Sequence, residues 1–177
     1  VLETFSNQSK PLRLVDVANS TGMALPNVNR FVRTLTALGY LHNDVETKRY
    51  NLSPKIMSFG ISALNNLDTR TRLYPFMQEI KAQFGVNVML SILHGTDILS
   101  IARISSFASH DLDHRIGKRL PAYCTAMGQC FLAFLSKNEF KSFWKKIGPI
   151  SHTPHTIIDE FLFIEEMAKI KEKGYAY

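Results

Sequence analysis

Hydrophobic residues near the start of the chain repeat at the spacing of short helices. Leu14, Val17 and Ala18 lie three and four positions apart, which places them on one face of a helix. Gly22 follows a polar run, at a point where a helix commonly ends in a left-handed residue that glycine adopts at low cost. Pro26 then suits the first turn of a second helix, because the N–H that proline lacks would have no helical partner there.

The second helix carries a longer apolar stripe. Its hydrophobic positions are Val28, Phe31, Val32, Leu35 and Leu38. This spacing is typical of an amphipathic helix, and Gly39 would end it. Two short strand-like runs follow, residues 40–44 and 49–52, joined by a turn at residues 45–48. The pattern up to Leu52 therefore predicts a helix-turn-helix followed by a β-hairpin wing.

The polar face of the second helix has an unusual composition. Exposed helix faces usually mix charges of both signs, but the segment from Ala24 to Leu38 contains no Asp or Glu. Asn can pair with adenine through two hydrogen bonds, and Arg can pair with guanine or bind phosphate. Ordinary solvation is the alternative, but the charge pattern favours nucleic-acid binding. The candidate DNA-binding residues are Asn27, Asn29, Arg30, Arg33 and Thr34 on the helix, with Lys48 and Arg49 at or beside the hairpin tip.

The rest of the chain mixes helical and strand-like patterns. Helical patterns cover residues 54–67, 69–84, 124–135 and 159–173, and strand-like patterns cover 86–93 and 98–104. The two strands predict a β-hairpin. Ser136 and Glu139 fit the capping box of a further helix. Pro75 must fall in the first turns of its helix or bend it.

Composition narrows the class of protein. The net charge is +6, and residues 1–60, with seven Lys and Arg against four Asp and Glu, carry +3 of it. The first segment is thus the more basic per residue, which is compatible with a polyanionic partner. Cys124 and Cys130 are the only cysteines and lie in an apolar stretch, which indicates reduced thiols in a cytoplasmic protein. No apolar run approaches the roughly 18 residues of a membrane span, so we expect no membrane partner.

Two features could indicate other chemistry. His110, Asp111, Asp113 and His114 supply enough donors for a metal, but they lie in a predicted loop, whereas zinc needs ligands held in fixed geometry. A solvated or effector-gating loop is the favoured interpretation. Cys124 could be a nucleophile, but no base is placed near it by spacing, and such a cysteine is usually a small buried hydrophobe. We therefore expect no enzyme, no metal and no cofactor.

The segment from Leu120 to Gly128 is the candidate ligand site. A helix N-terminus suits a carboxylate, and small residues let a ligand approach the backbone. Close packing of a helix on a sheet requires the same small residues, so both explanations stay open. The candidate effector-binding residues are Cys124, Thr125, Ala126, Met127 and Gly128 at the helix start, Leu90, Ile92 and Ile101 as an apolar wall, and Arg103 or Arg115 as the counter-charge. We expect the loop 105–115 to close over the ligand.

Two regions of the sequence resemble the IclR family of bacterial transcriptional regulators. They are TGMALPNVNRFVRTLTALGYL with ETKRYNLSPKIMSFG, and later IGKRLPAYCTAMGQCFLAFL. The resemblance implies an α+β protein. It would have a winged helix-turn-helix domain at 1–53, a linker helix at 54–68 and a GAF-like α/β effector-binding domain at 69–177. The family often has Ser-Thr where this chain has Pro26-Asn27, so base contacts made by that pair are not carried over.

The resemblance also implies function and assembly. Family members bind operator DNA, respond to a small-molecule effector, dimerise through the winged domains and form tetramers through the effector domains. We expect at least a dimer, with the helix near Ile56 to Leu67 at the interface. The run RLPAYCTAMG is similar to regulators that respond to protocatechuate or 4-hydroxybenzoate, which implies an organic or aromatic carboxylate effector. Family members continue beyond Tyr177, so we expect an effector domain that is incomplete at its C-terminus.

One alternative function comes from a different class. A GAF-like small-molecule-binding or enzymatic protein could use its winged helix for protein contacts. Such a protein would not need Arg30, Arg33, Lys48 and Arg49 together on one surface. The basic residues therefore favour the DNA-binding interpretation.

Overall fold

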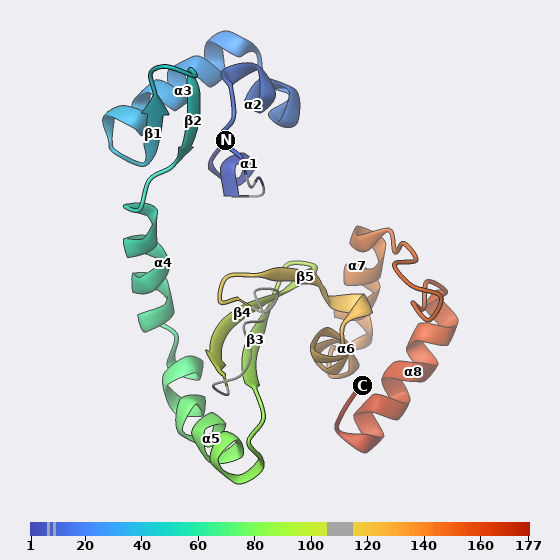
Figure 1. Cartoon of the computed structure of the whole chain (residues 1–177). Coiled ribbons are helices and arrows are strands. Elements are labelled where there is room, and N and C mark those ends of the chain that lie inside the picture. The colour runs from blue at the N-terminus through green and yellow to red at the C-terminus, as the bar shows by residue number, and fades with distance from the viewer. Residues whose placement is uncertain (7, 9, 106–114) are drawn as a thin grey trace. The chain divides into compact units, whose positions relative to one another are not determined.

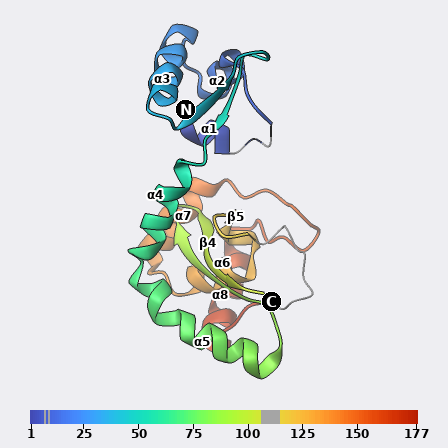
Figure 2. The same ribbon diagram turned by 60° about the vertical axis from the view of Figure 1, so that its left-hand side comes forward.

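The chain folds as two compact units, described here by a computed structural model. The structure describes residues 1–6, 8, 10–105 and 115–177. The units are Val1–Leu67 and Asp68–Tyr177, and each combines helices with a small antiparallel sheet (Figures 1 and 2). This confirms the expected α+β class.

The first unit is a helix-turn-helix with a hairpin. Its elements are α1 (Leu2–Ser6), α2 (Leu14–Thr21), α3 (Leu25–Ala37), β1 (Leu41–Asp44), β2 (Arg49–Leu52) and α4 (Ile56–Asn65). The turn between α2 and α3 depends on Gly22, whose φ of 67° lies in the left-handed region. β1 and β2 pair antiparallel from Leu41 opposite Leu52 to Asp44 opposite Arg49. The predicted helix-turn-helix and wing are therefore present.

The core of the first unit uses only part of the stripe predicted for α3. Val28 and Val32 are fully buried with Val17 of α2. Phe31 and Leu38 were expected on the same stripe, but they are 47% and 52% exposed. At 3.6 residues per turn both lie on the flank of α3, and this small unit has too few elements to cover a wide helix face.

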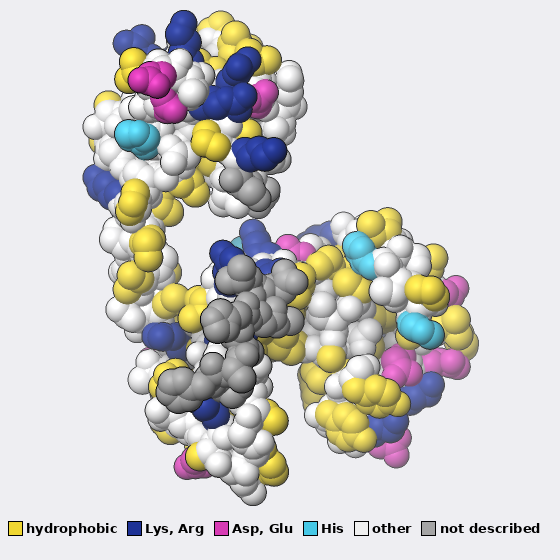
Figure 3. Space-filling model, viewed as in Figure 1, with side chains coloured by type: hydrophobic (Ala, Val, Ile, Leu, Met, Phe, Trp, Pro, Cys, Tyr) yellow, Lys and Arg dark blue, Asp and Glu magenta, His cyan; other side chains and the backbone are white. Residues whose placement is uncertain are grey.

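The helix α4 begins later than the sequence pattern predicted. It starts at Ile56 rather than Pro54, because Pro54 and Lys55 form a turn. None of its residues is buried. Hydrophobic side chains therefore lie along its surface, as the space-filling view in Figure 3 shows.

The second unit is built on a three-stranded sheet. Its elements are α5 (Asp68–Phe84), β3 (Val88–His94), β4 (Asp97–Ile104), β5 (Arg119–Pro121), a 3-10 turn (Ala122–Cys124), α6 (Ala126–Ala133), α7 (Lys137–Ile147) and α8 (Glu160–Lys173). The strand order is β3-β4-β5, with antiparallel neighbours. The short strand β5 was not predicted, because three residues are too few for a periodic pattern. Pro75 lies inside α5 rather than in its first turns.

An aromatic cluster forms the core between α7 and α8. The Phe163 side chain is fully buried, and its ring centroid lies 4.7 Å from that of Trp144 and 5.9 Å from that of Phe140. Ser136 and Glu139 form the predicted capping box at the start of α7. The hydrogen bonds from Ser136 lower the pKa of Glu139. This cluster packs α7 against α8.

Candidate nucleic-acid interface and ligand site

The surface of α3 presents the predicted polar residues to solvent. Asn27, Asn29, Arg30, Arg33 and Thr34 are all exposed. The buried pair Val28 and Val32 holds the opposite face against the core, so the polar face is fixed in orientation. Thr34 already donates its hydroxyl hydrogen to the carbonyl of Arg30 at 3.0 Å, which leaves its oxygen as an acceptor.

Hydrogen bonds to the Asp44 side chain stabilise the turn at the tip of the hairpin. The Asp44 carboxylate accepts hydrogen bonds from the backbone N–H groups of Glu46 and Thr47 at 3.0 and 3.2 Å. Hydrogen bonds from the side chain and backbone of Thr47 hold the pKa of Asp44 below its ordinary value. Lys48 is exposed and has a left-handed backbone with φ of 53°, which is unusual for a residue with a side chain. The Lys48 side chain is therefore exposed to solvent at the end of the turn.

Arg49 has a structural contact as well as a predicted DNA role. It lies in β2 and is only partly exposed, and its guanidinium donates to the carbonyl of Pro11 at 2.9 Å. Leu12 also pairs with Tyr50 through backbone hydrogen bonds of 2.9 and 2.8 Å. Arg49 thus ties the hairpin to the segment before α2, and only its remaining N–H groups face outward.

A groove between α3 and the hairpin adds residues that the sequence analysis missed. It has a volume of about 530 Å³ and is lined by Asn29, Arg33, Thr36, Ala37, Asn43 and Tyr50. Asn43 and Tyr50 are cross-strand partners and therefore share one face of the hairpin. Strand alternation could have found this pair, but only once the register was known.

Lys55 is a further residue that the sequence analysis missed. Its ammonium group donates to the Leu38 carbonyl at 2.8 Å and lies 4.8 Å from the centre of the Tyr40 ring. A cation at the C-terminus of a helix is favourable for the carbonyl dipoles there. Lys55 therefore secures the end of α3 from the turn that precedes α4.

The start of α6 differs from the prediction. The helix begins at Ala126 rather than Cys124, because Thr125 is its N-cap and accepts from the Gly128 N–H at 3.2 Å. Cys124 lies in the preceding 3-10 turn, and Ala126 is exposed. The N–H groups of Ala126 and Met127 are thus the ones at the open end of the helix.

Gly128 supports the packing explanation for the small residues. A Cβ at this position would lie 2.1 Å from the carbonyl oxygen of Ala122, closer than any side-chain atom can approach. Gly128 is buried against that turn. Its small size is therefore required by the contact between α6 and the 3-10 turn, whether or not a ligand binds nearby.

Two residues of the apolar wall proposed for the ligand site, Leu90 and Ile92, lie on the face of the sheet opposite α6. The Ser91 hydroxyl lies 3.5 Å from the Met127 sulfur, so Ser91 faces α6. Side chains alternate along a strand, which places Leu90 and Ile92 on the opposite face. Leu90 and Ile92 therefore do not face α6, and their role in effector binding stays a prediction. Ile101 is buried at an irregularity where Ser91 pairs with Ser100 and Leu90 with Ala102.

A small cavity lies between this sheet and α6. Among the described residues it has a volume of about 10 Å³, and its lining includes Met89, Ser91, Arg115 and Met127. That volume is about one water molecule. Arg103 is the cross-strand partner of Met89 and therefore shares this side. Of the predicted closing loop, residues 105–115, residues 106–114 lie outside the described residues, and these include His110, Asp111, Asp113 and His114.

Cys124 is a partly buried thiol. Burial raises its pKa, and the sulfur donates to the Pro121 carbonyl at 3.6 Å. A raised pKa keeps the thiol protonated, whereas a nucleophilic cysteine needs the thiolate. Within the described residues no group of three His, Cys, Asp or Glu side chains could hold a metal, and no helix is long and apolar enough to cross a membrane.

Comparisons with known proteins match both units of the chain to the same family. The model of the bacterial transcriptional regulator IclR C-terminal domain matches residues 61–177, and that of the IclR helix-turn-helix domain matches residues 1–45. The HTH-type transcriptional regulator XynR of Escherichia coli (strain K12) is 26% identical, covering 99% of this chain and 70% of the relative. The Pca regulon regulatory protein of Pseudomonas putida is 28% identical, with 99% and 60% covered.

A solved structure shares the fold. It is an IclR homolog from Microbacterium hydrocarbonoxydans complexed with 4-hydroxybenzoate, 20% identical, with a TM-score of 0.74 over 99% of this chain and 72% of the other. The chain therefore spans between 60% and 72% of the length of these three proteins.

Proposed function

Because this chain belongs to the IclR family of bacterial transcriptional regulators, we propose that it binds operator DNA through α3 and the hairpin and regulates transcription in response to a small molecule. The observation that carries the proposal is the acid-free polar face of α3, fixed by the burial of Val28 and Val32 beneath it. A DNA-binding regulator of this kind works in the cytoplasm, where the chromosome lies.

The residues of α3 and of the hairpin have different roles in this proposal. Asn29, Arg30 and Arg33 on α3 are long or two-pronged polar side chains suited to base edges in the major groove. Lys48 at the hairpin tip is a point charge suited to a phosphate. Arg49 contributes a weaker contact, because part of its guanidinium is held by Pro11. Asn27 and Thr34 extend the same face of α3.

The effector site belongs near the start of α6. A carboxylate there would meet the N–H groups of Ala126 and Met127, with Arg103 or Arg115 on the same side of the sheet as counter-charge. The 4-hydroxybenzoate complex of the Microbacterium homolog supports an aromatic carboxylate as the class of ligand. The cavity that the described residues form beside Met127 has a volume of about 10 Å³ and is smaller than such a ligand.

Assembly into dimers is supported by α4. Met57, Phe59 and Ile61 are 65%, 55% and 51% exposed, an apolar surface of the kind that marks protein interfaces. A single recognition helix covers few base pairs, and helix-turn-helix proteins commonly pair two copies on two half-sites. We propose at least a dimer through this surface. The alternative, a GAF-like protein that uses its winged helix for protein contacts, leaves the acid-free face of α3 unexplained.

Selection of bound duplexes from random DNA tests the proposal. The full chain should enrich a short motif, and two half-sites should appear if it binds as a dimer. Fluorescence anisotropy on the selected duplex and on a scrambled one then measures specificity. Enrichment of no motif, with equal binding to both duplexes, would overturn the proposed function.

A further inference from the structure

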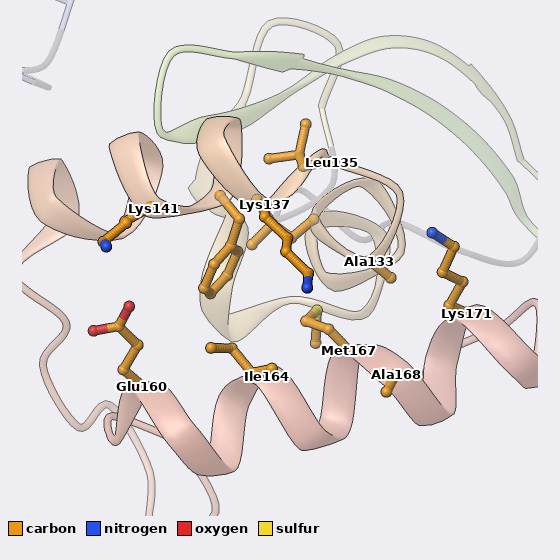
Figure 4. Close-up of a pocket in the computed structure, with 11 residues that line it drawn as sticks. Ala133, Leu135, Lys137, Lys141, Glu160, Ile164, Met167, Ala168 and Lys171 are labelled. Atoms are coloured by element: carbon orange, nitrogen blue, oxygen red, sulfur yellow. The ribbon is translucent and has the colours of Figure 1, made fainter.

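A groove on the second unit lies away from the proposed effector site. It runs between α6, α7 and α8 and has a volume of about 630 Å³. Its lining shares no residue with the start of α6, and Figure 4 shows its walls. The size falls within the roughly 300–1,000 Å³ of small-molecule pockets.

The floor of the groove is apolar and preformed. It includes Leu132, Phe140, Ile164 and Met167. The Phe140 ring is stacked at 5.7 Å on Trp144 and at 5.9 Å on the buried Phe163, so its orientation is fixed. A ligand would therefore meet a rigid surface and would need little rearrangement of the protein.

The rim of the groove is basic. Lys137 and Lys141 from α7 and Lys171 from α8 line it, against the single acid Glu160, which gives a local charge of +2. Figure 4 shows Lys137 reaching over the groove toward Met167, and Glu160 directed toward Lys141. Among the described residues none of these lysines lies within ion-pair distance of a carboxylate. Lys171 instead lies 5.8 Å from the centre of the Phe134 ring.

We propose that this groove binds an amphipathic organic anion, a carboxylate with a medium-length apolar chain. The carboxylate would lie between Lys137 and Lys171, and the chain would extend along Ile164 and the Phe140 ring. Glu160 disfavours the carboxylate at the Lys141 end, which fixes the orientation. This site is additional to the proposed effector site and does not depend on DNA binding.

Trp144 provides a direct readout of binding. It is the only tryptophan of the chain, and its ring contacts both Phe140 and Phe163. We expect decanoate, below its micelle concentration, to change the Trp144 emission with saturation, and calorimetry to give one site per chain. Butyrate should bind much more weakly because it lacks the apolar chain, and 1-decanol because it lacks the charge.

Three variants test the geometry. Ala168→Phe fills the groove from the exposed face of α8, so it should weaken decanoate binding by more than about tenfold. Lys137→Gln and Lys171→Gln should each weaken it about twofold to fivefold, and less at high salt. Lys169→Gln is the matched control, because Lys169 pairs with Glu166 outside the groove and its loss should leave binding unchanged.

The outcomes separate this proposal from its alternatives. Melting curves establish that each variant is folded, and the two lysine variants keep the test valid if Ala168→Phe does not fold. Equal binding of decanol and decanoate would overturn the proposal, as would unchanged binding in both lysine variants. If decanoate does not bind but Ala168→Phe changes the oligomeric state in light scattering, the groove is an interface between copies and the proposal is wrong.

Discussion

The helices α3 and α6 both follow a tight turn, but they differ in what their sequence reveals. α3 buries only Val28 and Val32 and directs a polar face outward, so its side chains carry the proposed function. α6 has apolar or small residues at every position except Gln129, and the N–H groups of its first residues, rather than their side chains, would contact a ligand. Side-chain recognition can be inferred from residue types, whereas backbone recognition depends on geometry that residue types do not specify.

The largest difference in stability is expected between alanine substitutions at two glycines, Gly128 and Gly60. Gly128→Ala would place a methyl group 2.1 Å from the Ala122 carbonyl oxygen, so we expect the second unit to lose about 3 kcal/mol or more. Gly60→Ala in α4 has open space and an ordinary helical backbone, so it should stabilise its helix by up to about 1 kcal/mol. Urea unfolding followed by Trp144 emission and by circular dichroism measures both. Equal stability of Gly128→Ala and the parent would show that α6 does not pack on the 3-10 turn as described.

The width of the buried apolar face of α3 can also be tested by comparing two alanine substitutions. Val32→Ala removes a fully buried side chain and should cost the first unit about 2 kcal/mol. Phe31→Ala removes an exposed one and should change stability by less than about 0.5 kcal/mol. Hydrogen exchange of the α3 amides compares the two variants. A larger loss of stability in Phe31→Ala than in Val32→Ala would contradict the finding that Phe31 lies outside the buried face of α3.

Substitution of Lys48 at the hairpin tip should change the stability of the first unit by a smaller amount. Lys48 holds a left-handed backbone with φ of 53°, which costs a residue with a side chain about 1 kcal/mol. Lys48→Gly should therefore stabilise the hairpin by up to that amount, while Lys48→Ala should not. Melting temperatures of the two variants provide the comparison. A lower melting temperature for the glycine variant would contradict the left-handed turn.

The smallest effect is a pH dependence at the same turn. The folded pKa of Asp44 is lowered, so its stabilising contribution is present above the ordinary carboxylate range and is lost as the pH falls through the folded pKa. Exchange of the Glu46 and Thr47 amides should accelerate only in that acidic range, and Asp44→Asn should remove most of the dependence. A transition near neutral pH would assign the effect to another group.

The elements of the first unit and the longer elements of the second were predictable, whereas the short strand β5 and the packing of the second unit were not. Leu14, Val17, Gly22 and Pro26 encode local structure in residue types and spacing, so the helices, their turn and the hairpin followed from the sequence. Phe31 was misplaced because the width of a buried stripe depends on how many elements cover it. In the second unit, β5 was too short to show a pattern.

The ligand site depended on relationships that the sequence does not contain. The facing of Leu90 and Ile92 is set by the position of Ser91 relative to Met127, and that contact joins residues far apart in the chain. The role of Gly128 became clear only from its distance to Ala122. Such long-range geometry, rather than composition, decides whether small residues serve packing or binding.

The most direct test of the central claim compares Arg30→Ala with Lys48→Ala on the selected duplex. Arg30→Ala should cost about 1–3 kcal/mol and relax the preference at one base position. Lys48→Ala should weaken binding to all sequences alike and flatten the dependence of affinity on salt. Titrations at several salt concentrations, on the selected duplex and on single-base variants, distinguish the two effects. Unchanged affinity in both variants would contradict the assignment of α3 and the hairpin to DNA.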